Sequence, residues 1–302
     1  MSISSKIAAM FPRKNRLAMT ILVRDEVDII GENIRFHATQ GVDHFTVMDN
    51  GSVDGTRELL SALSDEFDID IIDNPQHTID QDLWVTQMAQ QVCKSGRADW
   101  VIHNDADEFW VNSNGNLKRE IRRDIGVVSV SRQNMLPLLS DVSEPDYRFY
   151  DNVMRVAKSP GSGRNVVNPD ESLDIEMNLR KLPGKVMCRL NGLHHVQMGN
   201  HSVSHDGEVT RSDNTLIYHF PVRTFEQFVK KVSNYGSALE ANKRFSLGTS
   251  WHIRRWYKLL KLGQLEQEYE SMLLTAEQAS KLQSEGVLVR DETILSFHQD
   301  SN

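Results

Sequence analysis

The stretch that decides the fold is Trp100-Val101-Ile102-His103-Asn104-Asp105-Ala106-Asp107-Glu108-Phe109-Trp110. Its first part is apolar and β-prone, and its second part carries two aspartates one residue apart. Side chains alternate between the two faces of a strand, so residues i and i+2 point the same way. If strand geometry continues to Asp107, the carboxylates of Asp105 and Asp107 converge on one place. A divalent cation between them would relieve the repulsion of the two carboxylates. The cation would keep open coordination positions that substrate phosphates can fill.

A plainer alternative exists for this acidic pair, because Asp is also common in turns that follow a strand. The ligand pattern excludes a calcium-binding loop, which needs acidic or amide side chains where Phe109 and Trp110 stand. Carboxylate oxygens suit hard cations such as Mg²⁺ or Mn²⁺. The residues alone leave a metal site and an ordinary turn both open.

Short apolar runs alternate with amphipathic stretches in the first 110 residues. The predicted strands are 17–23, 44–48, 69–72 and 100–103, and the predicted helices are 27–40, 55–66 and 82–95. This alternation predicts an α/β fold with a mostly parallel sheet covered by helices. Ligands of such sheets bind beyond the carboxyl ends of the strands. The polar segments there, 24–26, 49–56 and 105–108, therefore predict one shared site.

The pattern changes after residue 110. Strands are predicted at 127–131, 185–190 and 216–220, and residues 140–184 read as a long loop that could cover the site. From Thr224 onward the chain reads as helical. We expect a loose leader at 1–15, a catalytic domain at 16–222 and a C-terminal helical extension at 223–302. The catalytic domain would divide into a nucleotide-binding half, 16–110, and an acceptor half, 111–222.

The composition narrows the class of protein. The chain has 302 residues, 39% of them hydrophobic and 25% charged, as in ordinary globular proteins, and its net charge of -8 argues against general nucleic-acid binding. Cys93 and Cys188 make neither a disulfide framework nor a zinc site. No apolar run reaches the roughly 18 residues of a membrane span, and the polar N-terminus does not resemble a signal peptide. We therefore expect a cytoplasmic protein.

Several basic residues are further candidates. Five histidines gather late in the chain, and His219 is the best metal ligand among them because it closes a strand-like run before Pro221. Lys185 and Arg189 could reach phosphate oxygens. For each of these residues the alternative is an ordinary structural histidine or a surface charge.

Residues 250–262 combine tryptophans with basic residues at helical spacing. Such a helix can lie on an anionic membrane surface. The alternative is a helix that packs on the main domain and leaves its basic face in water.

Taken together, these segments resemble a glycosyltransferase of the GT-A fold, family 2-like, in a bacterial subgroup. The acidic stretch at 98–110 carries the resemblance, with 23–26 similar to the first-strand motif, 48–56 to the second and 217–221 to a later histidine-containing strand. Asn50 departs from the second motif, where many members carry two acids. The resemblance covers roughly residues 16–240.

The resemblance implies a Rossmann-like sheet, a nucleotide-sugar donor and Mn²⁺ or Mg²⁺ as cofactor. The donor, a UDP- or GDP-sugar, would contact Arg24, Asp25, Glu26, Asp49, Asn50, Ser52, Asp54, Asp105 and Lys185. The metal would bind Asp105, Asp107 and His219. The reaction would invert the anomeric carbon with Glu171 or Asp174 as the base. The acceptor would be a glycan or lipid-linked saccharide of surface polysaccharide biosynthesis, reached at the inner membrane face.

Three other classes stay open. A nucleotidyltransferase would usually carry a Gly-rich basic loop after its first strand, where this chain has Asp25 and Glu26. A non-catalytic glycan-binding protein could keep the same fold. A metal-dependent hydrolase could be built on His103, Asp105 and Asp107.

Overall fold

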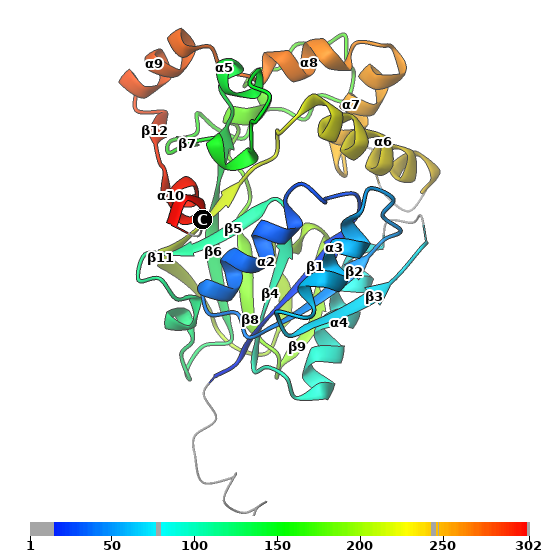
Figure 1. Cartoon of the computed structure of the whole chain (residues 1–302), viewed down its shortest axis with the longest axis vertical. Helices are drawn as coiled ribbons and strands as arrows, with labels where there is room; N and C mark the ends of the chain where they lie inside the picture. The colour runs from blue at the N-terminus through cyan, green and yellow to red at the C-terminus, as the bar shows by residue number, and fades with distance from the viewer. Residues whose placement is uncertain (1–14, 77–79, 243–245, 247, 301–302) are drawn as a thin grey trace, which may run out of the picture.

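The computed structural model describes residues 15–76, 80–242, 246 and 248–300. Within these residues ten strands form one sheet, in the order β12-β7-β6-β8-β4-β1-β2-β3, with β11 beside β6 and β5 beside β11 (Figure 1). The strands are β1 Leu17–Val23, β2 His44–Asp49, β3 Ile69–Asp73, β4 Trp100–Asp105, β5 Glu108–Asn112, β6 Val127–Leu136, β7 Met154–Val156, β8 Lys185–Arg189, β11 Val209–His219 and β12 Leu288–Arg290. A separate hairpin pairs β9 Leu193–Val196 with β10 Val203–His205.

The helices flank this sheet and continue into the C-terminal part. They are α2 Ile30–Thr39, α3 Thr56–Leu63, α4 Gln81–Ser95, α5 Leu139–Val142, α6 Phe225–Ala241, α7 Trp251–Lys261, α8 Leu265–Ser271, α9 Ala276–Ser284 and α10 Thr293–Asp300. In Figure 1, α6, α7 and α8 lie at the end of the molecule toward which β1 and β2 run. No helix within the described residues has both the length and the apolar character needed to cross a bilayer.

The predicted α/β architecture is confirmed. Strands β1, β2, β3 and β4 are parallel, and the register pairs Val23 with Asp49 and Leu22 with Asp105. The carboxyl ends of β1, β2 and β4 therefore meet at one edge, as the sequence predicted. Beyond β4 the direction changes, since β8 runs antiparallel to both β4 and β6.

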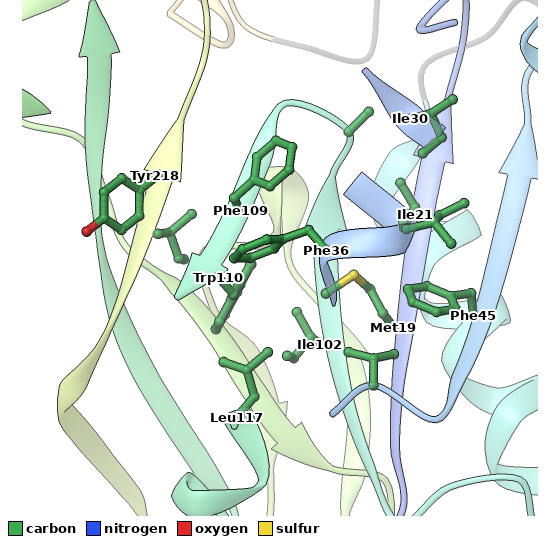
Figure 2. Packing of buried hydrophobic residues seen from close by; sticks show 14 of the residues in the cluster. Met19, Ile21, Ile30, Phe36, Phe45, Ile102, Phe109, Trp110, Leu117 and Tyr218 are labelled. Atoms are coloured by element: carbon green, nitrogen blue, oxygen red, sulfur yellow. The ribbon is translucent and has the colours of Figure 1, made fainter. Parts of the chain in front are cut away.

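The core explains why these runs become strands. Met19 and Ile21 of β1 pack with Phe45, Ile102 and the α2 residues Ile30 and Phe36 (Figure 2). The alternate residue Ala18 joins the cluster containing Ala89 and Val92 of α4 on the opposite face. Both faces of β1 are therefore buried, which is why its sequence is a nearly continuous apolar run, interrupted only by Thr20, rather than an alternating pattern.

Some predicted boundaries were wrong. The predicted loop at 140–184 contains the short strand β7, which pairs with β6 and β12, and the predicted helical region after Thr224 contains β12. Each of these strands has three residues, too few for period-2 alternation to be visible in the sequence. Leu136, Met154, Val156 and Leu288 form a small core of their own around them. The helix predicted at 27–40 begins at Ile30, and in the turn before it the N–H of Val27 donates to the carboxylate of Asp54.

The helix within residues 250–262 is α7, and its apolar side faces inward. Ile253, Trp256 and Leu259 are buried in a cluster with residues of α6 and α8, and the basic residue Arg255 is buried against Glu268. This packing favours the alternative of a helix docked on the protein. Leu262 at its end is exposed, beside Lys261.

Candidate active site

A turn follows β4 and sets the direction of the acidic residues. Residues 106–107 form this turn between β4 and β5, so strand alternation ends at Asp105. The buried amide of Asn33 on α2 donates to the carbonyl oxygens of Ala106 and Glu108 at 2.8 Å each, which holds the turn against the helix. The strand geometry on which the predicted convergence of Asp105 and Asp107 depends therefore does not continue, because the backbone turns before Asp107. Their joint binding of a metal stays a prediction.

The two aspartates contact different cations. The Asp105 carboxylate accepts from Nζ of Lys185 at 2.6 Å and from Nδ2 of Asn200 at 3.2 Å. The Asp107 carboxylate accepts from Nζ of Lys231, on α6, at 2.7 Å. Burial alone would raise the pKa of Asp107, but Lys231 and then His219 lower it well below its usual range. Asp107 is therefore an anion in an almost fully buried position.

His219 presents its second ring nitrogen to Asp107. Nε2 of His219 lies 3.6 Å from Oδ2 of Asp107, and Nδ1 lies 2.7 Å from Oδ1 of Asn134. The amide of Asn134 is oriented, because its Nδ2 donates to the carbonyl of Asn178 at 2.8 Å. We therefore assign the proton to Nδ1 of His219. Burial lowers the pKa of His219, against the opposing effect of Asp107. With the proton on Nδ1, the neutral ring turns the lone pair of Nε2 toward a carboxylate oxygen of Asp107.

This arrangement fits a divalent cation. Twice a usual metal–ligand bond of about 2.1 Å exceeds the 3.6 Å between Nε2 and Oδ2, so one ion could reach both atoms. The Nδ1–H bond to Asn134 is the kind of outer contact that orients a ligating imidazole. No group of three or more His, Cys, Asp or Glu side chains suited to a metal occurs in the described part of the chain. An ion here would therefore have two protein ligands and complete its shell with phosphate oxygens or water.

A second buried charge cluster lies behind the turn. Nζ of Lys185 is 3.2 Å from the carboxylate of Glu108, and both side chains are completely buried. Arg132 of β6 pairs with the other oxygen of Glu108. Burial would raise the pKa of Glu108, yet Lys185 and Arg132 lower it overall. Lys185 thus joins Glu108 to Asp105 and fixes the end of β4.

The loop after β1 carries a strained acidic residue. Asp25 has φ of +55°, which is unusual for a residue other than glycine. Its Oδ1 accepts from the N–H of Val53 at 2.7 Å, and its Oδ2 accepts from Nδ2 of Asn234, on α6, at 2.6 Å. Nε of Arg24 lies 3.9 Å from the same carboxylate. These contacts join the β1 loop, the β2 loop and α6.

Glu26 lies in the same loop and is held from the C-terminal side. Its carboxylate accepts from Arg223 at 2.5 Å, and Arg223 also pairs with Asp28 at 2.7 Å. Burial raises the pKa of Glu26 to about 7, with Arg223 lowering it and Asp107 raising it.

The loop after β2 uses most of its polar groups internally. Asn50 donates to the carbonyls of Asn74 and Gln76, Ser52 accepts from the N–H of Asp25, and Asp54 accepts from Thr56. Asp49 differs: its Oδ2 accepts from two turn amides, while its buried Oδ1 has no hydrogen-bond partner among the described residues. A buried carboxylate oxygen without a donor is costly, and a ligand hydroxyl would satisfy it.

Comparison with known proteins identifies the class. Residues 19–258 match the sequence profile of glycosyltransferase family 92. The chain belongs to glycosyltransferase family 92. The enzyme class implied by the motifs is therefore confirmed, whereas the more specific assignment to family 2 is not. No curated protein sequence matches the chain.

Solved structures similar to this family 92 chain are distant. TarS 1–349 from S. aureus has 10% identity over 85% of this chain and 72% of its own, with a TM-score of 0.40. The same protein in complex with UDP-GlcNAc has 9% identity over 85% and 73%, with a TM-score of 0.40. Glucosyl-3-phosphoglycerate synthase from Mycobacterium tuberculosis, in complex with Mn²⁺, UDP and glucosyl-3-phosphoglycerate, has 16% identity over 39% and 44%, with a TM-score of 0.27.

The two predicted bases lie on an exposed segment. The Asp174 carboxylate accepts from the N–H groups of Arg164 and Ile175 and pairs with Arg180 at 3.0 Å, so it shapes its own loop. Among the described residues, none pairs with the carboxylate of Glu171. The carbonyl of Glu171 accepts from Arg255 on α7 at 3.1 Å, which ties this segment to the C-terminal helices.

Sequence reasoning missed several residues of this candidate site. They come from β6, from the segment between β11 and α6, and from α6 and α7, and they are Arg132, Asn134, Arg223, Lys231, Asn234 and His252. Burial, and then the positive charges of Lys231, Arg132 and His219, lower the pKa of His252 to about 3. On α6 a signal was present, because Gln227, Lys231 and Asn234 recur at helical spacing and define one polar face.

Proposed function

We propose that this family 92 glycosyltransferase uses a nucleoside-diphosphate sugar and a divalent cation bound by Asp107 and His219. The observation that carries the proposal is the 3.6 Å distance between Nε2 of His219 and Oδ2 of Asp107, with Nδ1 of His219 engaged by Asn134. A divalent cation could bind both atoms, and a cation with two protein ligands can take diphosphate oxygens. Mn²⁺ or Mg²⁺ bound there would act as a Lewis acid toward the leaving diphosphate.

The nucleoside part of the donor would lie along the carboxyl ends of β1 and β2. Asp49 supports this, since its buried Oδ1 could accept from a ribose hydroxyl or a base N–H. Asp25 and Glu26 would lie beside the same nucleoside, and Asp105 would lie by the ribose and the metal. Arg24, Asn50, Ser52 and Asp54 would act by shaping the loops, and Lys185 by fixing Asp105. A UDP- or GDP-sugar meets these requirements.

We further propose inversion at the anomeric carbon, with a carboxylate that removes the proton of the acceptor hydroxyl. Between the two predicted bases we favour Glu171, because Asp174 already accepts hydrogen bonds from its own loop. The acceptor would be a glycan or a lipid-linked saccharide of surface polysaccharide biosynthesis, and the reaction would take place in the cytoplasm. Lys261 and the exposed Leu262 at the end of α7 are the residues we would expect at an inner membrane face.

The experiment compares binding and turnover in the full chain and in Asp107→Asn. Isothermal titration measures the binding of UDP and GDP with and without Mn²⁺, and donor hydrolysis is followed in parallel. We expect Mn²⁺-dependent nucleotide binding that D107N loses. The control is Asp65→Asn, an exposed aspartate after α3. Equal metal-dependent binding by D107N and the unchanged protein would refute the proposed metal site, and metal-independent binding would contradict the cation requirement.

A further inference from the structure

The polar face of α6 closes the candidate donor site. Gln227 donates to the carbonyl of Asp25 at 2.6 Å, Lys231 pairs with Asp107 at 2.7 Å and Asn234 donates to the carboxylate of Asp25 at 2.6 Å. These residues lie at positions i, i+4 and i+7 and therefore share one side of the helix. The opposite side, including Phe228 and Val232, is buried in the cluster that contains residues of α7 and α8.

The backbone of Lys231 is therefore fixed near Asp107 by contacts on both sides of α6. Its neighbours on the polar face bond to the β1 loop, and its apolar neighbours are packed. The side chain itself is about a quarter exposed, at 27%, so its ammonium group borders solvent. A lysine in this position can rotate about its own side-chain bonds, but it cannot leave the edge of the site.

The ammonium group of Lys231 contacts the same carboxylate oxygen that the proposed metal would bind. Oδ2 of Asp107 lies 2.7 Å from Nζ of Lys231 and 3.6 Å from Nε2 of His219. A divalent ion on this oxygen would repel an ammonium group in direct contact with it. The other nearby carboxylate, that of Glu26, already accepts from Arg223 and Gln227. The remaining anion in reach would be the diphosphate that arrives with the metal.

We propose that Lys231 is a donor-binding residue that exchanges partners, leaving Asp107 when the metal binds and pairing with the terminal phosphate of the nucleoside diphosphate. This inference rests on the proposed function. It assigns Lys231 two opposite effects: competition with the metal when no nucleotide is present, and attraction for the diphosphate when both bind. A lysine with a purely structural role would not produce this pair of opposite effects.

The test uses Lys231→Met, Lys231→Gln and Lys231→Arg, with Lys230→Met as the matched control. Lys230 is the adjacent residue of α6 and pairs with Glu226 in solvent. Isothermal titration of the full chain measures the affinity for Mn²⁺ alone and then for UDP, GDP, UMP and GMP in saturating Mn²⁺. Thermal melting of each variant checks that it is folded.

We expect K231M and K231Q to bind Mn²⁺ alone about threefold to tenfold more tightly, since a competing cation is gone. The same variants should bind the nucleoside diphosphate about tenfold to a hundredfold more weakly and the monophosphate with little change, because one charged hydrogen bond to the terminal phosphate is lost. K231R should keep most of the diphosphate affinity, and K230M should match the unchanged protein.

Two outcomes would overturn the inference and are distinguishable. If the unchanged protein binds diphosphates with Mn²⁺ and both K231M and K231Q bind them equally well, Lys231 moves to Glu26 or stays in place, and only this inference fails. If the unchanged protein shows no metal-dependent binding of UDP or GDP, the proposed function fails and the inference fails with it.

Discussion

The substitution Glu26→Gln tests the electrostatics of the site without touching the proposed metal ligands. The side chain of Glu26 is 15% exposed, and burial raises its pKa from 4.5 to about 7. The folded protein therefore keeps a proton on Glu26 between these pH values, while the unfolded chain loses it. Stability from this group is complete below pH 4.5 and is lost as the pH rises through 7. The shift of about 2.5 pKa units corresponds to roughly 3 kcal/mol.

The neutral amide in E26Q resembles the protonated carboxyl group, so the variant should not lose this stability. Urea denaturation of both proteins at pH 5, 6, 7 and 8, without metal or nucleotide, gives the difference in unfolding free energy. That difference should change by about 2.5 kcal/mol in favour of E26Q between pH 5 and pH 8, somewhat less than the full shift because Glu26 is still partly protonated in the unfolded chain at pH 5. The low pKa of Asp107 acts only in a more acidic range and does not interfere. Glu58→Gln, an exposed residue of α3, is the control. A pH-independent difference for E26Q would mean that Arg223 keeps Glu26 ionised, and the reasoning would be refuted.

Two further predictions concern the proposed ligands and the proposed base. Asn134→Leu removes the acceptor that fixes the Nδ1–H tautomer of His219, so the Mn²⁺ affinity of the folded variant, measured by titration, should fall about tenfold or more. The melting temperature should fall as well, because the buried carbonyl of Asn178 loses its donor. Unchanged Mn²⁺ affinity would show that Asn134 does not orient the ring. Glu171→Gln should lower kcat for sugar transfer about a hundredfold or more and leave donor affinity unchanged, whereas Asp174→Asn should lower thermal stability instead; equal kcat values for E171Q and the unchanged protein would exclude Glu171 as the base.

The sequence was sufficient to predict the parallel half of the sheet, because the information there is local. The strand at Leu17–Val23 lies within one apolar run, and helices α3 and α4 lie inside the predicted ranges or within one residue of them. The shared edge followed from topology alone, since parallel strands bring their carboxyl ends together. The direction of Asp107 did not follow, because it depends on a turn that Asn33, more than 70 residues away, holds in place.

The partners of the acidic residues could not be predicted for a related reason. Lys231 is 124 positions from Asp107, Lys185 is 80 from Asp105 and Arg223 is 197 from Glu26. No periodicity relates residues at such separations, and each is an ordinary basic residue in its own segment. The packing of α6 against the strand ends brings Lys231 to Asp107, and the pairing of β8 with β4 brings Lys185 to Asp105.

The long sequence separations between these charged partners matter for the predicted division of the chain into a catalytic domain and a C-terminal extension. The expected boundary at residue 222 separates a sheet-containing region from a helical one in the sequence, but the charges cross it. Arg223, Lys231 and Asn234 neutralise or bond Glu26, Asp107 and Asp25, which lie at the ends of the first and fourth strands. Without these partners the acidic edge would carry several buried carboxylates with too few counterions, which is costly in a poorly solvated place. The acidic loops and α6 are therefore best regarded as one electrostatic unit, formed only when both regions have folded together.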